Sequence, residues 1–152
     1  MILMAKLEEA IKQSNFQSQT QKAVLNILYT SNHISESTTP FFKENGILQQ
    51  HYNVLRIVRG KNGEPASPGQ IIEVMLDKGR DLTRLVDKLV KLGYLRRGNS
   101  ATNRRKVEIF ITELGLEITE KISVQLTEFY KKLDIDEDQA QQINELLDKI
   151  RG

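Results

Sequence analysis

The chain of 152 residues contains no cysteine and no tryptophan. Without thiols it can form no disulfide, no thiolate metal site and no cysteine redox switch. Aromatic residues make up only 6% of the chain, so stacking platforms for unpaired bases are not expected. No apolar run approaches the roughly 18 residues of a membrane span, and no signal peptide is recognisable. We therefore expect a cytoplasmic protein with no membrane partner.

Catalytic and metal-binding patterns are also missing. The only histidines, His33 and His51, are not within helical reach of each other, and no spacing adds carboxylate ligands to either. No Ser/His/Asp set, paired carboxylates or glycine-rich phosphate loop stands out. The sequence predicts that the protein is not an enzyme, holds no metal and needs no cofactor.

The overall net charge of +2 conceals a division along the chain. Residues 47–112 contain 13 Lys+Arg and 6 Asp+Glu, a net charge of +7, whereas the remaining 9 basic and 14 acidic residues give −5. Solubility alone does not require such segregation. The division indicates a basic binding module carried by a neutral-to-acidic scaffold.

The segment from Gly79 to Lys91 predicts a basic amphipathic helix. Its apolar residues recur at i, i+3, i+4 and i+7: Leu82, Leu85, Val86 and Leu89. The other face is mostly cationic, with Arg80, Arg84, Lys88 and Lys91, and Asp81 and Asp87 are expected to be local partners within the helix. Gly93 provides a left-handed C-cap. A solvated surface helix is the alternative to a helix that enters a groove of DNA.

A hairpin is expected next, with strands at Tyr94-Leu95 and Val107–Ile111 and a turn at Gly98-Asn99-Ser100. Five cations crowd it: Arg96, Arg97, Arg104, Arg105 and Lys106. Like charges repel unless a polyanion lies between them, so the hairpin favours a nucleic-acid partner over ordinary surface charge.

A shorter helix is expected to precede the basic one. Ser67 as N-cap, Pro68 at the first position and Gln70 at the third position form a capping box. The predicted buried face is Ile71, Ile72, Met75 and Leu76, and Asp77-Lys78-Gly79 forms the turn into the basic helix. Two short helices joined in this way predict a helix-turn-helix.

Both ends of the chain read as helices. Residues 1–42 show helical spacing with a break at Gln13–Gln21, and Pro40 predicts a kink or the end of the second helix. Thr112 is expected to cap a long helix that runs to Leu133, and Asp136 with Gln139 caps the last one.

Apolar stripes on the terminal helices either complete a monomeric bundle or form a dimer interface. We prefer the interface, because paired helix-turn-helix units bind half-sites about one helical turn apart. The predicted dimerisation residues are Leu7, Ile11, Phe129, Leu133, Ile143, Leu146, Leu147 and Ile150. The predicted fold class is mainly α with a small β-hairpin wing: residues 46–112 form the winged helix-turn-helix, intertwined with a dimerisation region at residues 1–45 and 113–152.

TRLVDKLVKLGYLRR followed by NRRKVEIFITELG resembles the recognition helix, wing and next helix of the multiple-antibiotic-resistance regulator (MarR) family, and HYNVLRIV resembles the preceding helix. The resemblance implies a two-fold symmetric homodimer on a pseudo-palindromic operator, often released by a small-molecule effector. One departure concerns the wing. The family usually has an aspartate two residues before its groove-entering arginine, whereas this chain has Asn103 ahead of Arg105.

The predicted function is a sequence-specific, double-stranded DNA-binding transcriptional regulator, most often a repressor in such a family. An arginine can bridge guanine O6 and N7, and wing arginines suit a narrow minor groove. The candidate DNA-binding residues are Ser67, Gln70, Arg80, Thr83, Arg84, Lys88, Asn103, Arg104 and Arg105. Capping alone is the alternative role of Ser67 and Gln70, and a winged-helix module docking an acidic protein is the alternative function.

Overall fold

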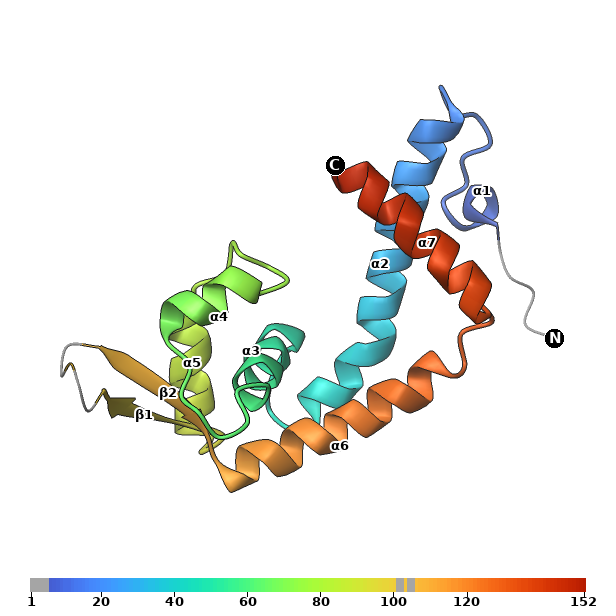
Figure 1. Cartoon of the computed structure of the whole chain (residues 1–152). Helices are drawn as coiled ribbons and strands as arrows, with labels where there is room; N and C mark the ends of the chain where they lie inside the picture. The colour runs from blue at the N-terminus through green and yellow to red at the C-terminus, as the bar shows by residue number, and fades with distance from the viewer. Residues whose placement is uncertain (1–5, 101–102, 104–105) are drawn as a thin grey trace. The chain divides into compact units, whose positions relative to one another are not determined.

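The computed structural model describes residues 6–100, 103 and 106–152. It divides into two compact units, one reaching to Gln49 and the other starting at Gln50. The first unit contains the short helix α1 (Leu7–Ala10) and the long helix α2 (Gln19–Lys43) (Figure 1). The predicted break between the two helices is confirmed, since the chain between Ile11 and Ser18 is not helical.

Pro40 does not end α2, which continues for three further residues to Lys43. A proline removes one backbone donor and clashes with the preceding turn. Within that turn, the hydroxyl of Thr39 donates to the carbonyl of Ser35 (2.7 Å), and the backbone hydrogen bond from Glu44 to Pro40 (3.0 Å) extends the ladder. The helix therefore passes the proline and stops only at the turn around Gly46, whose φ of 71° is left-handed.

The second unit contains α3 (Gln49–Arg59), α4 (Pro68–Val74), α5 (Leu82–Lys91), an antiparallel hairpin of β1 (Leu95–Asn99) and β2 (Val107–Ile111), α6 (Glu113–Tyr130) and α7 (Glu137–Arg151). The buried core of its central part is aliphatic, drawn from helices and hairpin alike: Val54, Leu55, Val58, Ile71, Val86, Leu89, Leu95, Ile109 and Ile122. This is the predicted winged helix-turn-helix, with the hairpin beside α5 (Figure 1). Within the described chain, no helix is long and apolar enough to span a membrane.

Local capping signals place the helix starts as expected. The capping box at Ser67 and Gln70 is complete: the Ser67 hydroxyl accepts from the Gln70 amide (3.3 Å), and the Gln70 side chain accepts from the Ser67 amide (3.0 Å). Asp136 and Gln139 form a second complete box at α7, and Thr112 caps α6 by accepting from the Gly115 amide (3.0 Å).

The predicted buried face of α4 is half wrong. Ile71 and Met75 are buried, whereas Ile72 and Leu76 are 44% and 78% exposed. The helix ends at Val74 and Met75 is already extended, with ψ of 139°, so the helical spacing no longer applies at Leu76. The side-chain oxygen of Asn53 accepts from the Leu76 amide (3.1 Å) and fixes this turn instead.

Candidate nucleic-acid interface

Helix α5 begins at Leu82, three residues after the predicted start at Gly79. Asp81 is the N-cap and accepts from the Arg84 amide (3.3 Å), so Arg80 lies in the preceding turn and not on the helix. The guanidinium of Arg80 is 2.7 Å from Asp77. The prediction that Arg80 belongs to the cationic helix face is therefore wrong, because an aspartate that caps a helix excludes the residue before it.

The two faces of α5 are clearly separated. Leu82, Val86 and Leu89 are buried, and the exposed side carries Thr83, Arg84, Asp87, Lys88 and Lys91. The side chain of Arg84 is 87% exposed, and its pair with Asp81 (3.3 Å) is a surface ion pair of little energy. Breaking this ion pair therefore costs little free energy, and the Arg84 side chain can turn toward a ligand.

The end of α5 is set by Gly93, as predicted. Its φ is 77°, and the amides of Gly93 and Tyr94 donate to the carbonyls of Val90 (3.0 Å) and Leu89 (2.9 Å). These two hydrogen bonds are a Schellman motif, which needs a left-handed residue at this position. The motif turns the chain directly from α5 into the hairpin.

The hairpin is longer than predicted, and Gly98-Asn99 is not its turn. Gly98 pairs with Glu108 and Asn99 pairs with Val107, so both belong to β1. A Cβ at Gly98 would lie 3.2 Å from the ring of Phe110, which indicates that the glycine makes room for that ring. The connection begins at Ser100, whose amide donates to Lys106 (3.1 Å).

Of the three wing cations that the structure describes, Arg96 and Arg97 have partners within the protein. The guanidinium of Arg96 lies 3.9 Å from the centre of the Phe110 ring, and Arg97 is 2.6 Å from Asp87 on α5. Asp87 is therefore bound to the hairpin, and the expectation of a partner within its own helix is wrong, while that expectation is confirmed for Asp81. Hence the repulsion argument does not apply to Arg96 and Arg97.

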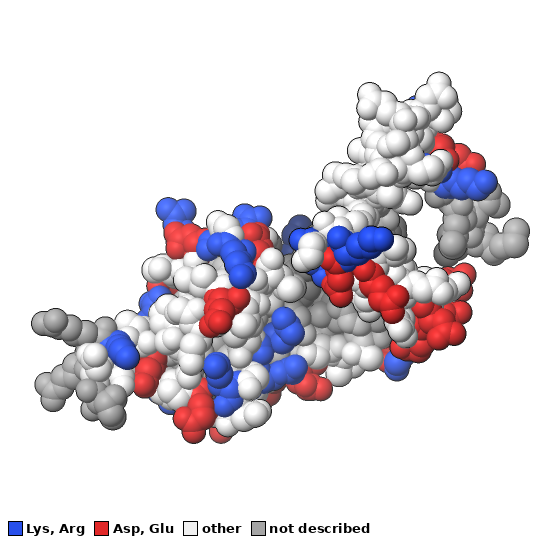
Figure 2. Space-filling view, turned by 45° about the horizontal axis from the view of Figure 1, so that its top comes forward, with Lys and Arg blue, Asp and Glu red and all other residues white. Residues whose placement is uncertain are grey.

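The candidate wing residues Arg104 and Arg105 lie outside the described residues. Asn103 is described, and its carbonyl accepts from the Lys106 amide (2.9 Å). On the face in view in Figure 2, basic and acidic side chains are interspersed around the hairpin and the helices beside it. The cations of this module are thus partly balanced by neighbouring carboxylates.

No family model matches the chain. The known proteins that are similar to it in sequence or structure are transcriptional regulators. The HTH-type transcriptional regulator PapX of Escherichia coli is 30% identical over 100 residues, which are 66% of this chain and 61% of the relative, so the chain spans less than two thirds of that relative's length. The structure of a MarR transcription factor from Planctomyces limnophilus is 27% identical, with a TM-score of 0.66 over 90% of this chain and 96% of that one.

A second solved structure, a MarR mutant from Escherichia coli complexed with operator DNA, is similar over 90% of this chain and 99% of that one, with a TM-score of 0.73 at 20% identity. In both comparisons the similarity covers nearly the whole of each chain. This is a MarR-like winged-helix protein.

The predicted dimerisation residues of this MarR-like chain differ in exposure. Leu7 is buried, and Ile11, Phe129, Leu133 and Leu147 are half-buried. The stripe of α7 is open: Ile143, Leu146 and Ile150 are 43%, 62% and 61% exposed, and no residue of this fully described helix is buried. An apolar stripe left open on a helix is typical of a surface that another chain covers.

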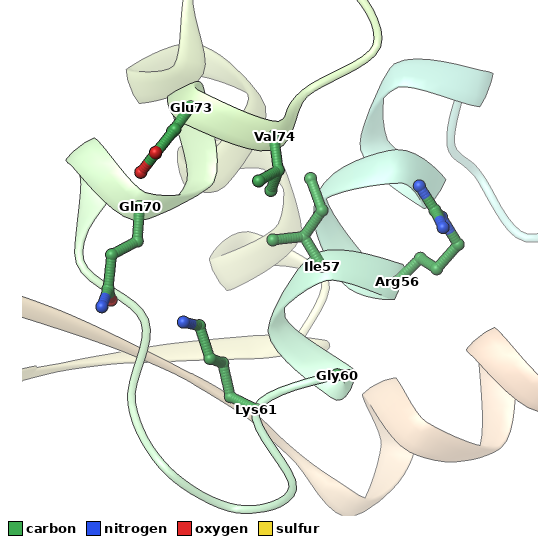
Figure 3. Close-up of a pocket in the computed structure, with 7 residues that line it drawn as sticks. All are labelled: Arg56, Ile57, Gly60, Lys61, Gln70, Glu73 and Val74. Atoms are coloured by element: carbon green, nitrogen blue, oxygen red, sulfur yellow. The ribbon is translucent and has the colours of Figure 1, made fainter.

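A shallow hollow of about 500 Å³ in the MarR-like module lies between α3 and α4 and the loop that follows α3. Figure 3 shows that Arg56 points away from the other lining side chains, whereas Lys61 and Glu73 point toward the hollow. Ile57 and Val74 supply apolar surface. The sequence did not indicate this hollow, because its lining comes from separate segments with no shared motif.

His51 lies in the MarR-like module with 8% of its surface exposed. Burial lowers the pKa of its imidazole, and the positive charge of Lys88 lowers it further. Among the described residues, no group of three or more His, Asp or Glu could hold a metal ion. His51 is therefore a buried side chain of α3 whose charged form is disfavoured.

The lowered pKa of His51 predicts a stability that declines as the pH falls below about 6.5, the ordinary value of histidine. In that range the unfolded chain takes up a proton that the folded chain resists. Denaturant unfolding between pH 7.5 and 5.5 should show a shallower decline for His51→Gln than for wild type. His33→Gln, at an exposed position of α2, should retain the wild-type slope. Equal slopes for His51→Gln and wild type would contradict the prediction.

Proposed function

We propose that this protein is a sequence-specific, double-stranded DNA-binding transcriptional regulator. One observation carries the proposal: an exposed row of Thr83, Arg84 and Lys88 on α5, beside a basic hairpin, in a fold shared with a regulator that is bound to operator DNA. A helix of this kind fits the major groove of B-DNA, and a hairpin beside it reaches the adjacent backbone or minor groove.

The individual contacts follow from side-chain chemistry. Arg84 is proposed to donate to guanine O6 and N7, and Lys88 to a phosphate. Ser67 and Gln70 use one oxygen each in the capping box, so the Gln70 amino group at the exposed start of α4 is left available to a phosphate. Arg80 in the turn before α5, and Asn103, Arg104 and Arg105 in the wing, complete the proposed contact set.

The proposed assembly is a homodimer on a pseudo-palindromic operator. The open stripe of α7 supports it, and residues 1–45 with 113–152 would form the dimerisation region. The two modules would enter successive major grooves, about one helical turn apart. A repressor role and a small-molecule effector remain predictions from the family resemblance. We also propose that the protein has no enzymatic activity, acts in the cytoplasm and needs no cofactor.

Arg84→Ala and Arg105→Ala are expected to fail in different ways. Loss of a bidentate guanine contact should cost about 1–3 kcal/mol and relax the preference at one position of each half-site. Loss of a wing cation should weaken binding to many sequences alike. It should also reduce the slope of the logarithm of the binding constant against the logarithm of the salt concentration by about one unit per half-site. The measurement is a titration of both variants against the operator, its single-base variants and unrelated DNA over a range of salt.

The operator for this test comes from selection of bound duplexes out of a random pool. A pseudo-palindromic consensus would support both the function and the dimer symmetry. If Arg84→Ala leaves the base preference unchanged, α5 does not read the major groove through this residue. If the wild-type protein selects no sequence but binds an acidic protein, the alternative of a protein-docking winged helix replaces the proposal.

A further inference from the structure

The ion pair between Asp87 and Arg97 links the two parts of the proposed DNA-binding surface. Asp87 lies in the middle of α5, and Arg97 is the central residue of β1. Their side chains meet at 2.6 Å between Oδ1 and Nη2. The ion pairs of Arg80 and Arg84 are local, with their partners three residues away along the chain. The pair of Asp87 and Arg97 therefore joins the middle of the helix to the middle of the wing.

Among the described residues, the buried contacts of the wing lie near its base. Leu95 and Ile109 are buried, and a bridge joins Ala66 to Ile109 by two hydrogen bonds of 2.9 Å. Farther out, Asn99 and Val107 are exposed, so the described outer ends of the two strands have little packing to hold their angle. A short two-stranded hairpin is only marginally stable by itself. A contact at mid-strand is well placed to fix the direction in which the wing points.

Side chains on the two faces of β1 contact different parts of the protein. Arg96 lies over the ring of Phe110, its cross-strand partner, which stiffens the hairpin internally. Arg97, the next residue, points to the opposite face, as alternation along a strand requires, and there it meets Asp87. Only Arg97 of the two thus connects the hairpin to the recognition helix.

The small folding energy of this ion pair and the charge of Asp87 both indicate that the pair orients the wing more than it stabilises the fold. The side chains of Arg97 and Asp87 are 39% and 55% exposed, and exposed ion pairs contribute little to folding. A lone carboxylate on the face of α5 that carries Arg84 and Lys88 would repel phosphates. Pairing with Arg97 neutralises it.

We propose that Asp87 and Arg97 are a positioning pair that sets the wing at a fixed distance and angle from the recognition helix. The inference rests on the proposed DNA-binding function and deepens it: the pair decides whether helix and wing can engage adjacent grooves at once. The MarR resemblance implies an ion pair in the wing that Asn103 cannot form, because an amide has no charge. The pair of Asp87 and Arg97 would replace it.

The first test needs no DNA. Because the chain has no cysteine, spin labels can be placed at Thr83→Cys on α5 and Asn99→Cys on β1, with labelled chains diluted into unlabelled ones. In the wild-type background we expect a narrow distance distribution, and in Asp87→Asn and Arg97→Gln a clearly broader one. The same width in all three proteins would overturn the proposal, whether or not the protein binds DNA.

The second test measures the wing on the selected operator by hydroxyl-radical footprinting and titration. Asp87→Asn and Arg97→Gln should lose protection in the flanks and roughly five- to tenfold in affinity, while the base preference of the half-sites and the melting temperature stay unchanged. The reversed pair Asp87→Arg/Arg97→Asp should regain the flank protection. The matched control is reversal of the exposed pair Glu128 and Lys131 at the C-terminal end of α6 (2.7 Å), which should alter neither property.

Several results would contradict the positioning role. Tighter binding of Asp87→Asn to all DNA would make Asp87 a repelling charge only, and a lost base preference would make the pair a base reader. Failure of the reversed pair to regain the flank protection would also overturn it. Failure of the wild-type protein to select any duplex would instead defeat the proposed function, and the spin-label distances would still decide whether the pair holds the wing.

Discussion

Replacement of Gly115 by alanine is expected to destabilise the winged module strongly. A Cβ at this position would lie 2.1 Å from the carbonyl oxygen of Tyr94 and 2.8 Å from the Ile111 side chain. Real Cβ atoms do not approach backbone this closely, so the first turn of α6 would have to move away from the end of α5. The site cannot absorb the methyl group by a rotamer change, because the obstacle is backbone.

Other hydrogen bonds at the same junction raise the cost of that movement. Thr112 donates from its hydroxyl to the Gly93 carbonyl (2.6 Å) and accepts from the Gly115 amide (3.0 Å). A shift of α6 would strain both bonds. We expect a loss of about 1–3 kcal/mol or more, enough to outweigh the gain of under 1 kcal/mol that alanine normally brings to a helix.

Thermal and denaturant unfolding of the full chain measure this prediction. The melting temperature of Gly115→Ala should fall by roughly 2–12 °C, at about 2–4 °C per kcal/mol. The matched control is Gly69→Ala in α4, where the nearest atom to an added Cβ is 4.0 Å away and the helix should be unharmed. An unchanged midpoint for Gly115→Ala would show that α5 and α6 are not joined as tightly as their geometry indicates.

The second large effect is expected from charges on the open stripe of α7. Leu146→Glu/Ile150→Glu should convert the proposed dimer to monomers, because both side chains are more than half exposed in the single chain and would be covered by a partner. The monomer itself should remain folded, since no residue of α7 contributes to its buried core.

Affinity for the operator should also fall when the dimer separates into monomers. Two linked modules bind one operator with an effective concentration that a free monomer lacks, so a loss of at least about 100-fold is expected. Sedimentation and operator titration measure the two effects, and circular dichroism checks the fold. Gln141→Glu adds the same kind of charge on the opposite face of α7 and should remain dimeric. A full-length wild-type chain that is a stable monomer at micromolar concentration would contradict the proposed assembly.

The elements that local chemistry specifies were predictable from the sequence. Ser67 with Gln70, and Asp136 with Gln139, place two helix starts because the capping groups lie three residues apart in the chain. Gly93 places a helix end because a left-handed residue is needed there. Helical spacing of apolar residues likewise predicted α5. In each case, both partners of the decisive interaction belong to one short segment.

Predictions failed where the deciding partner is distant in sequence or where two local signals compete. Gly98 looks like a turn residue, yet the ring of Phe110 across the hairpin explains it. Leu76 looks like part of a buried helix face, yet Asn53 of α3 holds its amide in a turn. Arg80 was predicted on the helix because it continues the pattern of cations. The N-cap at Asp81 excludes it, since the helix begins only after the cap.

The sequence by itself determined the order of the helices, the helix-turn-helix and the cationic face of α5, because hydrophobic period and capping act within a few residues. Only the tertiary structure decided which charges are available to a ligand. Asp87 and Arg97 are ten positions apart and meet through the reversal at Gly93, and Gly115 is constrained by the carbonyl of Tyr94, which follows α5. Such contacts depend on how elements pack, and packing joins residues that no periodicity links.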